Sequence, residues 1–415
     1  MKTTFKIVIV PLLARLAALR KRSIPLSIAC CMLLLLEPLT PSALGQAGLT
    51  IPDTPPAMAI VVGDLNGDGR ADLALIEEPP AKPQTSAPAS FRLHLLFQKE
   101  GKFAMPADQS ITLGATRPSS LAIGDFDGDK RNDLAVGLRV ERILSLYLGA
   151  ERFEKEHRSR YGNDTGAGGL SIGRLNQNGL ADFLTGAAWR QWQGDDRFGE
   201  AYFAGPERND NWRSTLADMD RNGTDDVIFT TYSSGKLDKP ANNRIRIYYG
   251  PFFKMQILQP SDAAQVVTLD SPLMDHDKPI LGQVLAGDLN DDSQLDLVVP
   301  ASGQTLVYLQ NSPTGFSEHA NPTVALKDAM PLLVTDLDGD KLCDIAFLPT
   351  AATQIAIWFQ KKNQELSDQS VSEAPQIKVP KMSGVVAAGD MDGDGRQEIF
   401  AAIKGGGIAI FALPR

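Results

Sequence analysis

Short aliphatic runs alternate with polar, glycine-rich loops along most of the chain. The first example is VVGDLNGDGRADLALI, from Val61 to Ile76, in which one apolar run stops at an acidic loop and another begins directly after it. Runs of this length, rich in Val, Ile and Leu and bounded by Gly, Asp and Asn, are typical of β-strands joined by tight turns. The pattern predicts an all-β protein.

The strand–acidic loop–strand pattern occurs seven times. Each copy follows the form apolar strand, D-x-[DN]-x-[DN]-x-x-x-[DE], apolar strand, apart from the third, which begins with arginine. The first positions of the seven loops are Asp64, Asp125, Arg174, Asp218, Asp288, Asp336 and Asp390. The copies lie about 50 residues apart, which is the length of one four-stranded propeller blade. We therefore expect residues 46–415 to form a seven-bladed β-propeller of antiparallel, four-stranded blades.

The loops carry oxygen atoms at the spacing that a calcium ion requires. Calcium takes about six to eight oxygen ligands in a flexible shell, whereas magnesium demands stricter geometry and keeps its waters. Side chains at positions 1, 3 and 5 can point inward, the main-chain carbonyl of position 7 adds a ligand, and the acid at position 9 closes the shell. Gly67 and Gly69 allow the left-handed backbone of such a sharp turn. EF-hands and dockerins share the opening of the motif, but they close it at position 12 and lie between helices.

We expect about six calcium sites, between the first two strands of every blade except the third. The expected ligands, including the position 7 residues that contribute a main-chain carbonyl, are Asp64, Asn66, Asp68, Arg70 and Asp72; Asp125, Asp127, Asp129, Arg131 and Asp133; Asp218, Asp220, Asn222, Thr224 and Asp226; Asp288, Asn290, Asp292, Gln294 and Asp296; Asp336, Asp338, Asp340, Leu342 and Asp344; and Asp390, Asp392, Asp394, Arg396 and Glu398.

The third loop is expected to hold no calcium. It has Arg174 at position 1, followed by Asn176, Asn178 and Asp182 at positions 3, 5 and 9. A guanidinium group at position 1 can take the place of the cation and pair with Asp182.

These repeats resemble the FG-GAP/VCBS family, whose best-known members are the calcium-binding propellers of integrin alpha subunits. The resemblance covers residues 46–415, and the segments YFAGP at Tyr202–Pro206 and YYGP at Tyr248–Pro251 also match family pieces outside the loops. It implies a blade of strands A to D with a calcium site in the A–B loop of each complete repeat. The phenylalanine–glycine portion is weak, so the integrin comparison concerns fold and metal and not the partner.

The first 45 residues resemble a secretory signal peptide. A long basic segment precedes the apolar run Ser23–Leu36, and a small-residue stretch follows with cleavage expected after Gly45. We expect a secreted, periplasmic or cell-surface protein; an uncleaved membrane anchor is the alternative. Cleavage removes Cys30 and Cys31 and leaves Cys343 alone, so no intramolecular disulfide can form. Bound metal is then the expected source of extra stability, although ring closure and core burial are an alternative.

The mature N-terminus is expected to complete the ring. Only GGGIAIFALPR follows the seventh repeat, which suffices for a third strand but not for a fourth. The segment GLTIPDT, Gly48–Thr54, can supply the outer strand of blade seven. A disordered N-terminus is the alternative.

No catalytic group is evident in the sequence. The four histidines, His94, His157, His276 and His319, are scattered over separate repeats. The segment Gly169–Gly173 fits the G-x-S-x-G pattern of a nucleophile elbow, but it leads into an A–B loop instead of a helix. A net charge of −9 disfavours nucleic acid or an anionic membrane as a partner. We therefore expect a monomeric, non-catalytic binding module for a glycan or a protein, with a lyase-like carbohydrate enzyme and a structural scaffold as alternatives.

A partner is expected on the face opposite the calcium loops, where three insertions should lie. These are the proline-rich segment after Ile76, the segment AAWRQWQGDDRFG, and the connection from Met255 to Gly282, which contains Asp275, His276 and Asp277. In the second insertion, exposed Trp189 and Trp192 beside Arg190 would suit a sugar ring or a protein hot spot. The alternative is that both tryptophans fold back onto the blade.

Overall fold

The computed structural model divides the chain into two compact units, Met1–Ser42 and Ala43–Arg415, and describes residues of the second. The expected signal peptide, residues 1–45, lies outside the described residues. No helix in the described part is long and apolar enough to cross a membrane. The described residues are 48–79, 90–138, 143–149, 153–160, 170–185, 188–194, 198–203, 211–232, 244–253, 257–268, 284–301, 304–310, 315–316, 324–327, 329–349, 353–362, 366–367 and 374–413.

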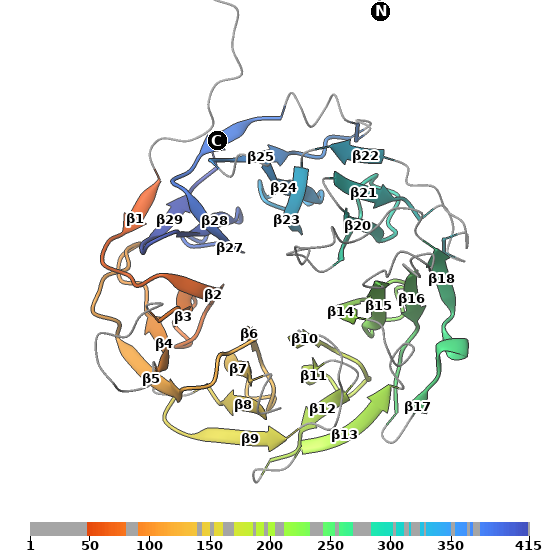
Figure 1. The fold of residues 1–415 in the computed structure, drawn as a ribbon, viewed down its shortest axis with the longest axis horizontal. Coiled ribbons are helices and arrows are strands. Elements are labelled where there is room, and N and C mark those ends of the chain that lie inside the picture. Colours follow the sequence, from red (N-terminus) through yellow and green to blue (C-terminus); the bar gives the residue numbers. More distant parts are fainter. Residues whose placement is uncertain are drawn as a thin grey trace, which may run out of the picture. The chain divides into compact units, whose positions relative to one another are not determined.

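Seven sheets form a ring, with the first strand of each blade nearest the centre (Figure 1). Blades one to four consist of β2 (Ala57–Gly63), β3 (Asp72–Glu77), β4 (Phe91–Leu96) and β5 (Gln109–Gly114); β6 (Ser120–Gly124), β7 (Asp133–Leu138), β8 (Ile143–Tyr147) and β9 (Glu156–Arg160); β10 (Leu170–Gly173), β11 (Asp182–Thr185), β12 (Ala188–Trp192) and β13 (Phe198–Phe203); and β14 (Asn211–Ala217), β15 (Asp226–Tyr232), β16 (Arg244–Tyr248) and β18 (Gln265–Thr268).

Blades five to seven repeat the arrangement. They consist of β19 (Leu285–Gly287), β20 (Asp296–Ala301), β21 (Gln304–Tyr308) and β22 (Val324–Lys327); β23 (Ala329–Thr335), β24 (Asp344–Pro349), β25 (Gln354–Trp358) and β26 (Gln376–Lys378); and β27 (Met382–Gly389), β28 (Glu398–Ile403), β29 (Ile408–Phe411) and β1 (Leu49–Ile51). The prediction of an all-β, seven-bladed propeller is confirmed.

Two details around blade four differ from the expectation. The segment expected to be a connection between blades four and five contains β18, the outer strand of blade four, which pairs with β16. The two-residue strand β17 (Ile257–Leu258) lies parallel to β13 and gives blade three a fifth strand. The residues Asp275, His276 and Asp277, expected in this connection, lie outside the described residues.

The core lies between neighbouring blades. The second and third strands of a blade are covered on both faces, and β7 and β8 are buried along their whole length. This explains why these strands read as nearly continuous aliphatic runs instead of alternating ones. In one such layer, Leu93 and Leu95 of blade one and Val136 of blade two belong to a single apolar cluster.

Close approach of neighbouring first strands requires small residues at their ends. A Cβ atom on Gly63 would lie 2.7 Å from Ile123 Cδ1 of blade two, and one on Gly389 would lie 2.3 Å from Val62 Cγ1 of blade one. Both distances are shorter than van der Waals contact, so these positions exclude larger side chains. At Gly63 and Gly389, the absence of a side chain before the acidic loop therefore allows neighbouring blades to pack tightly.

Strand β1 lies at the outer edge of blade seven. It pairs antiparallel with β29, with Leu49 opposite Ile410 and Ile51 opposite Ile408. Ile51 is 1% exposed and joins an apolar cluster with residues of blades seven and one, whereas Leu49 is 46% exposed. The N-terminal segment thus contributes an outer strand to the last sheet, and we expect this pairing to close the ring.

Deletion of residues 46–54 should lower the melting temperature sharply, because it would expose the edge of β29 and the core beneath Ile51. The point variant Ile51→Ala should cost about 2–5 kcal/mol of unfolding free energy, the usual range for removing a buried aliphatic side chain. The matched control Leu49→Ala should change it by less than about 0.5 kcal/mol, as is usual for exposed positions. Thermal and denaturant unfolding measure these effects. An unchanged melting curve after the deletion would refute a closing role for β1.

Candidate metal centre

The position 1 carboxylate organises the tip of each acidic loop that begins with aspartate. In the first loop, Asp64 Oδ1 accepts a hydrogen bond from Gly67 N at 2.7 Å, and its Oδ2 accepts one from Gly69 N at 2.8 Å. In the second loop, Asp125 accepts from Gly128 N at 2.7 Å and from Lys130 N at 3.0 Å. The loop therefore wraps around this carboxylate, and the main-chain amides of the loop point toward the carboxylate oxygens.

Positions 4 and 6 have a left-handed backbone. Gly67 and Gly69 have φ values of 79° and 81°, as the sequence predicted. In other loops non-glycine residues adopt the same conformation, for example Arg221 at position 4 with φ 60° and Lys341 at position 6 with φ 72°. Because L-residues other than glycine rarely adopt positive φ, the conformation of these residues does not follow from local preference and is held by the hydrogen bonds of the loop.

The acid at position 9 is buried in every blade. The six aspartates at this position are 0% exposed and Glu398 is 4% exposed. In the second loop Asp133 Oδ2 accepts from Phe126 N at 2.8 Å, and its Oδ1 accepts from the main-chain N of Gly149, at the end of the third strand. The equivalent pairs of amides are Leu65 and Gln98, Met219 and Gly250, Leu289 and Gln310, and Leu337 and Gln360. This carboxylate therefore ties the loop to two strands of its own blade.

Burial of these carboxylates changes their acidity. Loss of solvation raises the pKa of Asp72 to about 6 and the pKa values of Asp133 and Asp226 to about 7, against main-chain hydrogen bonds that lower them. The pKa values of Asp296 and Asp344 rise to about 7 for the same reason. Negative neighbours in the loop add to these shifts. A positive ion beside the carboxylates would reverse this effect, because it favours the ionised form.

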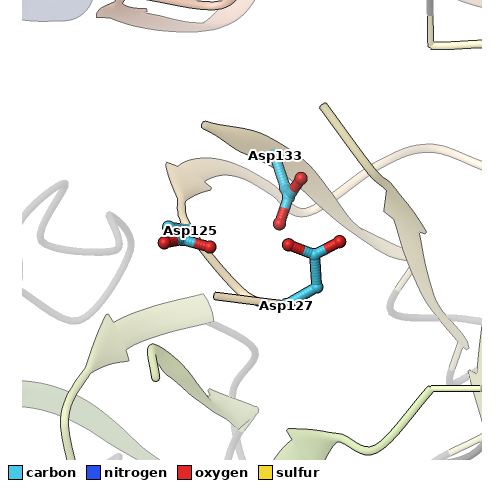
Figure 2. A group of neighbouring side chains, drawn as sticks. All are labelled: Asp125, Asp127 and Asp133. Carbon is cyan, nitrogen blue, oxygen red and sulfur yellow. The ribbon is translucent and has the colours of Figure 1, made fainter. Parts of the chain in front are cut away.

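Carboxylates at positions 1, 3 and 9 converge in four loops. Oxygen atoms of the three side chains lie within 4.8 Å of one another in loops two, four, six and seven. Figure 2 shows the group in loop two, with Asp125 and Asp127 from the loop and Asp133 from the head of β7. Three oxygen donors at this separation suit a hard dication such as calcium, so the donor set fits the expected metal. The groups are Asp125, Asp127 and Asp133; Asp218, Asp220 and Asp226; Asp336, Asp338 and Asp344; and Asp390, Asp392 and Glu398.

Loops one and five are built differently at position 3. They carry Asn66 and Asn290 there, so an amide oxygen replaces one carboxylate. Asn66 Oδ1 accepts from Asp68 N at 2.9 Å, and Asn290 Oδ1 accepts from Asp292 N at 3.0 Å, as position 3 acids do in other loops. These loops keep the fold of the others with a smaller negative charge. Their status as calcium sites remains a prediction.

Position 5 side chains lie outside the four carboxylate groups. Each accepts a hydrogen bond from the main-chain N of position 7, as Asp68 does from Arg70 N at 3.0 Å. In loop two the guanidinium of Arg131 also forms an ion pair with Asp129. Burial alone would raise the pKa of Asp129, but the hydrogen bonds and charge of Arg131 outweigh burial, so the pKa is lowered. The same pair forms between Arg396 and Asp394 in loop seven. The remaining expected ligands, Asp340, Asn222, Thr224, Gln294 and Leu342, occupy the same loop positions, and their coordination remains a prediction.

The third loop corrects one expectation. Arg174 makes no ion pair with Asp182 among the described residues; Asp182 instead accepts from Leu175 N at 3.0 Å and from Gln191 Nε2 at 2.7 Å. Arg174 N donates to Asp225 Oδ2 of the next blade at 2.6 Å, and its charge acts to lower the pKa of Asp225, which burial raises. Loop three is thus linked to blade four at Arg174, while the anchor at position 9 is satisfied within blade three.

Neighbouring loops are hydrogen-bonded to one another through position 8. Asn132 Nδ2 of loop two donates to Asp64 O of loop one at 2.8 Å, and Ala181 N of loop three donates to Asp125 O of loop two at 3.2 Å. Asp225 N of loop four donates to Arg174 O of loop three at 2.7 Å. The A–B loops therefore lie side by side on one face of the propeller.

The expected ligand-binding aromatic residues are not exposed, and that interpretation is wrong. Trp189, Arg190 and Trp192 belong to strand β12 and are 2%, 0% and 7% exposed. Trp189 packs in the layer between blades three and four, and Trp192 packs between blades two and three. The segment forms a third strand covered on both faces, so its alternating side chains enter the two adjacent layers. The alternative interpretation, in which both tryptophans pack onto the blade, is confirmed by their burial.

The G-x-S-x-G segment has no nucleophile elbow in the described residues. Ser171 lies within β10, is 8% exposed, and donates a hydrogen bond from its hydroxyl to Ser214 O at 2.9 Å.

The sequence analysis did not identify the main-chain and side-chain groups of the third strand that donate hydrogen bonds to the acid at position 9. They lie up to 26 residues from their carboxylate, as Gln98 does from Asp72. A recurring glutamine after the third strand, at Gln98, Gln310 and Gln360, was a detectable signal.

Comparison with known proteins gives a family match and a weak structural likeness. Residues 336–401 match the family model described as FG-GAP-like repeat. A catalytically inactive variant of virginiamycin B lyase from Staphylococcus aureus with quinupristin is 13% identical over 89% of this chain and 99% of that one, with a TM-score of 0.46. The selenomethionine-substituted lyase is 12% identical over 88% and 98%, with a TM-score of 0.45. No curated protein sequence matches the chain.

The matched segment starts at the loop of blade six and ends within β28 of blade seven. It therefore contains one complete repeat unit from loop to loop, and the same loop and strand order recurs around the ring. The match to an FG-GAP-like repeat over residues 336–401 and the ring of seven four-stranded blades together support a propeller of the FG-GAP type.

Proposed function

We propose that this protein is an exported, calcium-stabilised propeller that acts as a binding module for a glycan or a protein. One observation carries the metal part of the proposal: carboxylates at positions 1, 3 and 9 converge within 4.8 Å at the same place in four blades. Hard oxygen donors in a tight loop are what calcium requires. The family match supports the same function for the loops, since propellers of this kind bind metal there.

Electrostatics give the ion a role in folding. Folding brings three carboxylates of one loop together and buries one of them fully, which is unfavourable without a compensating positive charge. An ion that binds only the folded state stabilises it by RT ln(1 + [L]/Kd), about 2.7 kcal/mol per site when its concentration is a hundred times Kd. Several sites in one closed ring would make the whole fold calcium-dependent.

The anchoring hydrogen bonds would serve the metal as well as the fold. Asp133 would offer an oxygen to the ion while Phe126 N and Gly149 N fix its orientation. Groups that orient a ligand in this way hold a site ready for the metal. Position 5 and the main-chain carbonyl of position 7 would complete the shell, together with water.

A partner would bind on the face opposite the A–B loops. Contacts between neighbouring loops support this placement, because they occupy one face with the metal sites. The other face carries the connections between second and third strands and between blades.

The N-terminal sequence pattern supports export. The only cysteine outside that region is Cys343, a free thiol. Burial raises the pKa of this thiol to about 12, so it is a poor nucleophile.

Removing a position 1 carboxylate should remove one calcium site. Asp125→Asn and Asp336→Asn should each lower the number of bound calcium ions by one and reduce the rise in melting temperature that calcium causes. Arg174→Ala is the matched control in blade three and should leave both quantities unchanged. Metal analysis of dialysed protein and a calcium titration of the melting temperature measure them. Equal calcium content in Asp125→Asn and the unaltered protein would contradict the assignment of loop two.

Calcium and pH should have coupled effects on stability. Without metal, the position 9 aspartates have pKa values raised from 3.8 to about 6 or 7. Their contribution to stability is then complete below about pH 4 and is lost as the pH rises through those values. Calcium needs ionised ligands, so its stabilisation should grow over the same window. The rise in melting temperature caused by calcium should be much larger at pH 7.5 than at pH 5; an equal rise at both would argue against these ligands.

Glycan-array binding of the full chain in calcium, repeated after the metal is removed, tests the partner. Binding to one class of glycan that is lost with the metal is the expected result. If the folded, calcium-loaded protein retains no glycan, the glycan part of the proposal fails and a protein partner is left.

A further inference from the structure

Blade one contains a hydrogen-bonded serine, histidine and glutamate that the metal sites do not use. Ser110 Oγ lies 2.8 Å from His94 Nδ1, and Glu77 Oε2 lies 3.0 Å from His94 Nε2. The three residues stand on adjacent strands β5, β4 and β3, with His94 directly opposite Ser110 in the β4–β5 pairing. They form one continuous row across the sheet.

The propeller fold does not require this row. In blades five, six and seven the residue equivalent to His94 in strand pairing is Leu306, Ala356 or Ala409. These residues are apolar and buried, whereas blades two and four have buried Ser145 and Arg246 at the equivalent position. The fold therefore accepts either kind of residue there, and a buried histidine costs desolvation that the apolar residues avoid. Packing therefore does not require the row of Ser110, His94 and Glu77, because three blades pack with an apolar residue at the position of His94.

The order of the three groups matches that of an activated nucleophile. A carboxylate can only accept, so Glu77 holds the proton on His94 Nε2 and leaves the lone pair of Nδ1 toward Ser110 Oγ. A nucleophile within hydrogen-bond reach of a base, which a third group orients, is the arrangement used in serine hydrolases. Here the two ring nitrogens exchange places relative to the usual triad, but either nitrogen of imidazole can accept a proton.

The proposed nucleophile, Ser110, is accessible to solvent, while the other two residues of the row are more buried. Ser110 is exposed, whereas His94 is 6% exposed and the Glu77 side chain is 24% exposed. Strand β5 is the outermost strand of its sheet among the described residues, so alternate main-chain N–H groups beside Ser110 point away from β4. Such amides can donate hydrogen bonds to an oxyanion.

We propose that Ser110, His94 and Glu77 form an acyl-transfer site for ester substrates on blade one. Ser110 Oγ attacks the ester carbonyl carbon while its proton passes to His94 Nδ1, and Glu77 stabilises the resulting imidazolium through Nε2–H. The tetrahedral intermediate collapses, the C–O bond to the alcohol breaks, and the alcohol leaves with the proton from Nδ1. Water, deprotonated by the same nitrogen, then attacks the acyl-serine and releases a carboxylic acid and free Ser110.

The test is covalent labelling of the folded full chain, in calcium, by a fluorophosphonate, together with hydrolysis of p-nitrophenyl acetate. We expect one adduct, located on Ser110 by mass spectrometry, and a burst of p-nitrophenol. Ser110→Ala should abolish both, and Glu77→Gln and His94→Gln should slow labelling by about 100-fold or more, the usual contribution of a general base. Thr112→Ala removes an exposed hydroxyl on the same strand and should react like the unaltered protein.

The variants separate catalysis from misfolding. Ser110 is exposed and Glu77 is partly exposed, so both substitutions should leave the melting temperature unchanged, and loss of labelling in folded Ser110→Ala protein then reports the nucleophile. The proposal is overturned if the folded protein is labelled no faster than heat-unfolded protein. It is also overturned if Ser110→Ala is labelled as fast as Thr112→Ala, or if the rate does not respond to substitution of His94 and Glu77.

Discussion

Burial of one carboxylate at the head of the second strand is the constraint on which each blade depends. Asp133 is fully buried, and it is tolerated because main-chain amides of the loop and of the third strand donate to it. Unpaired, a buried charge of this kind would cost several kcal/mol. The hydrogen bonds orient the carboxylate but leave its negative charge uncompensated, and the raised pKa expresses that remaining cost. A calcium ion would complete the compensation.

Blade three shows that the structural role of this carboxylate does not depend on an acid at position 1. Asp182 keeps its amide partner Leu175 and gains the side chain of Gln191, although position 1 is an arginine. The loop keeps its place between neighbouring loops through the bond from Asp225 N to Arg174 O. Anchoring of position 9 is therefore present in all seven blades, while the aspartate at position 1 of the other six is explained by the ion that we propose.

The repeat made the fold predictable, but contacts distant in sequence were not. Seven copies of a strand–loop–strand pattern defined the blades, and in loop one Gly67 and Gly69 defined the turn. The partners of position 9, such as Gln98 for Asp72, follow a whole strand and a connection of variable length. Trp189 and Trp192 were misplaced because polar residues around them suggested a loop, whereas a strand covered on both faces buries them. Ser110, His94 and Glu77 meet only through strand pairing, 16 and 17 residues apart, and form no sequence motif.

Anomalous scattering from crystals of this protein grown with calcium would locate any bound ions. We expect anomalous peaks between the side chains of positions 1, 3 and 9 in the loops that start with aspartate. We expect no peak in the loop of Arg174, where Asp182 should keep its bonds to Leu175 and Gln191. Loops without any peak at saturating calcium, with position 9 still buried and anchored, would show that the carboxylates serve the fold alone and would contradict the account.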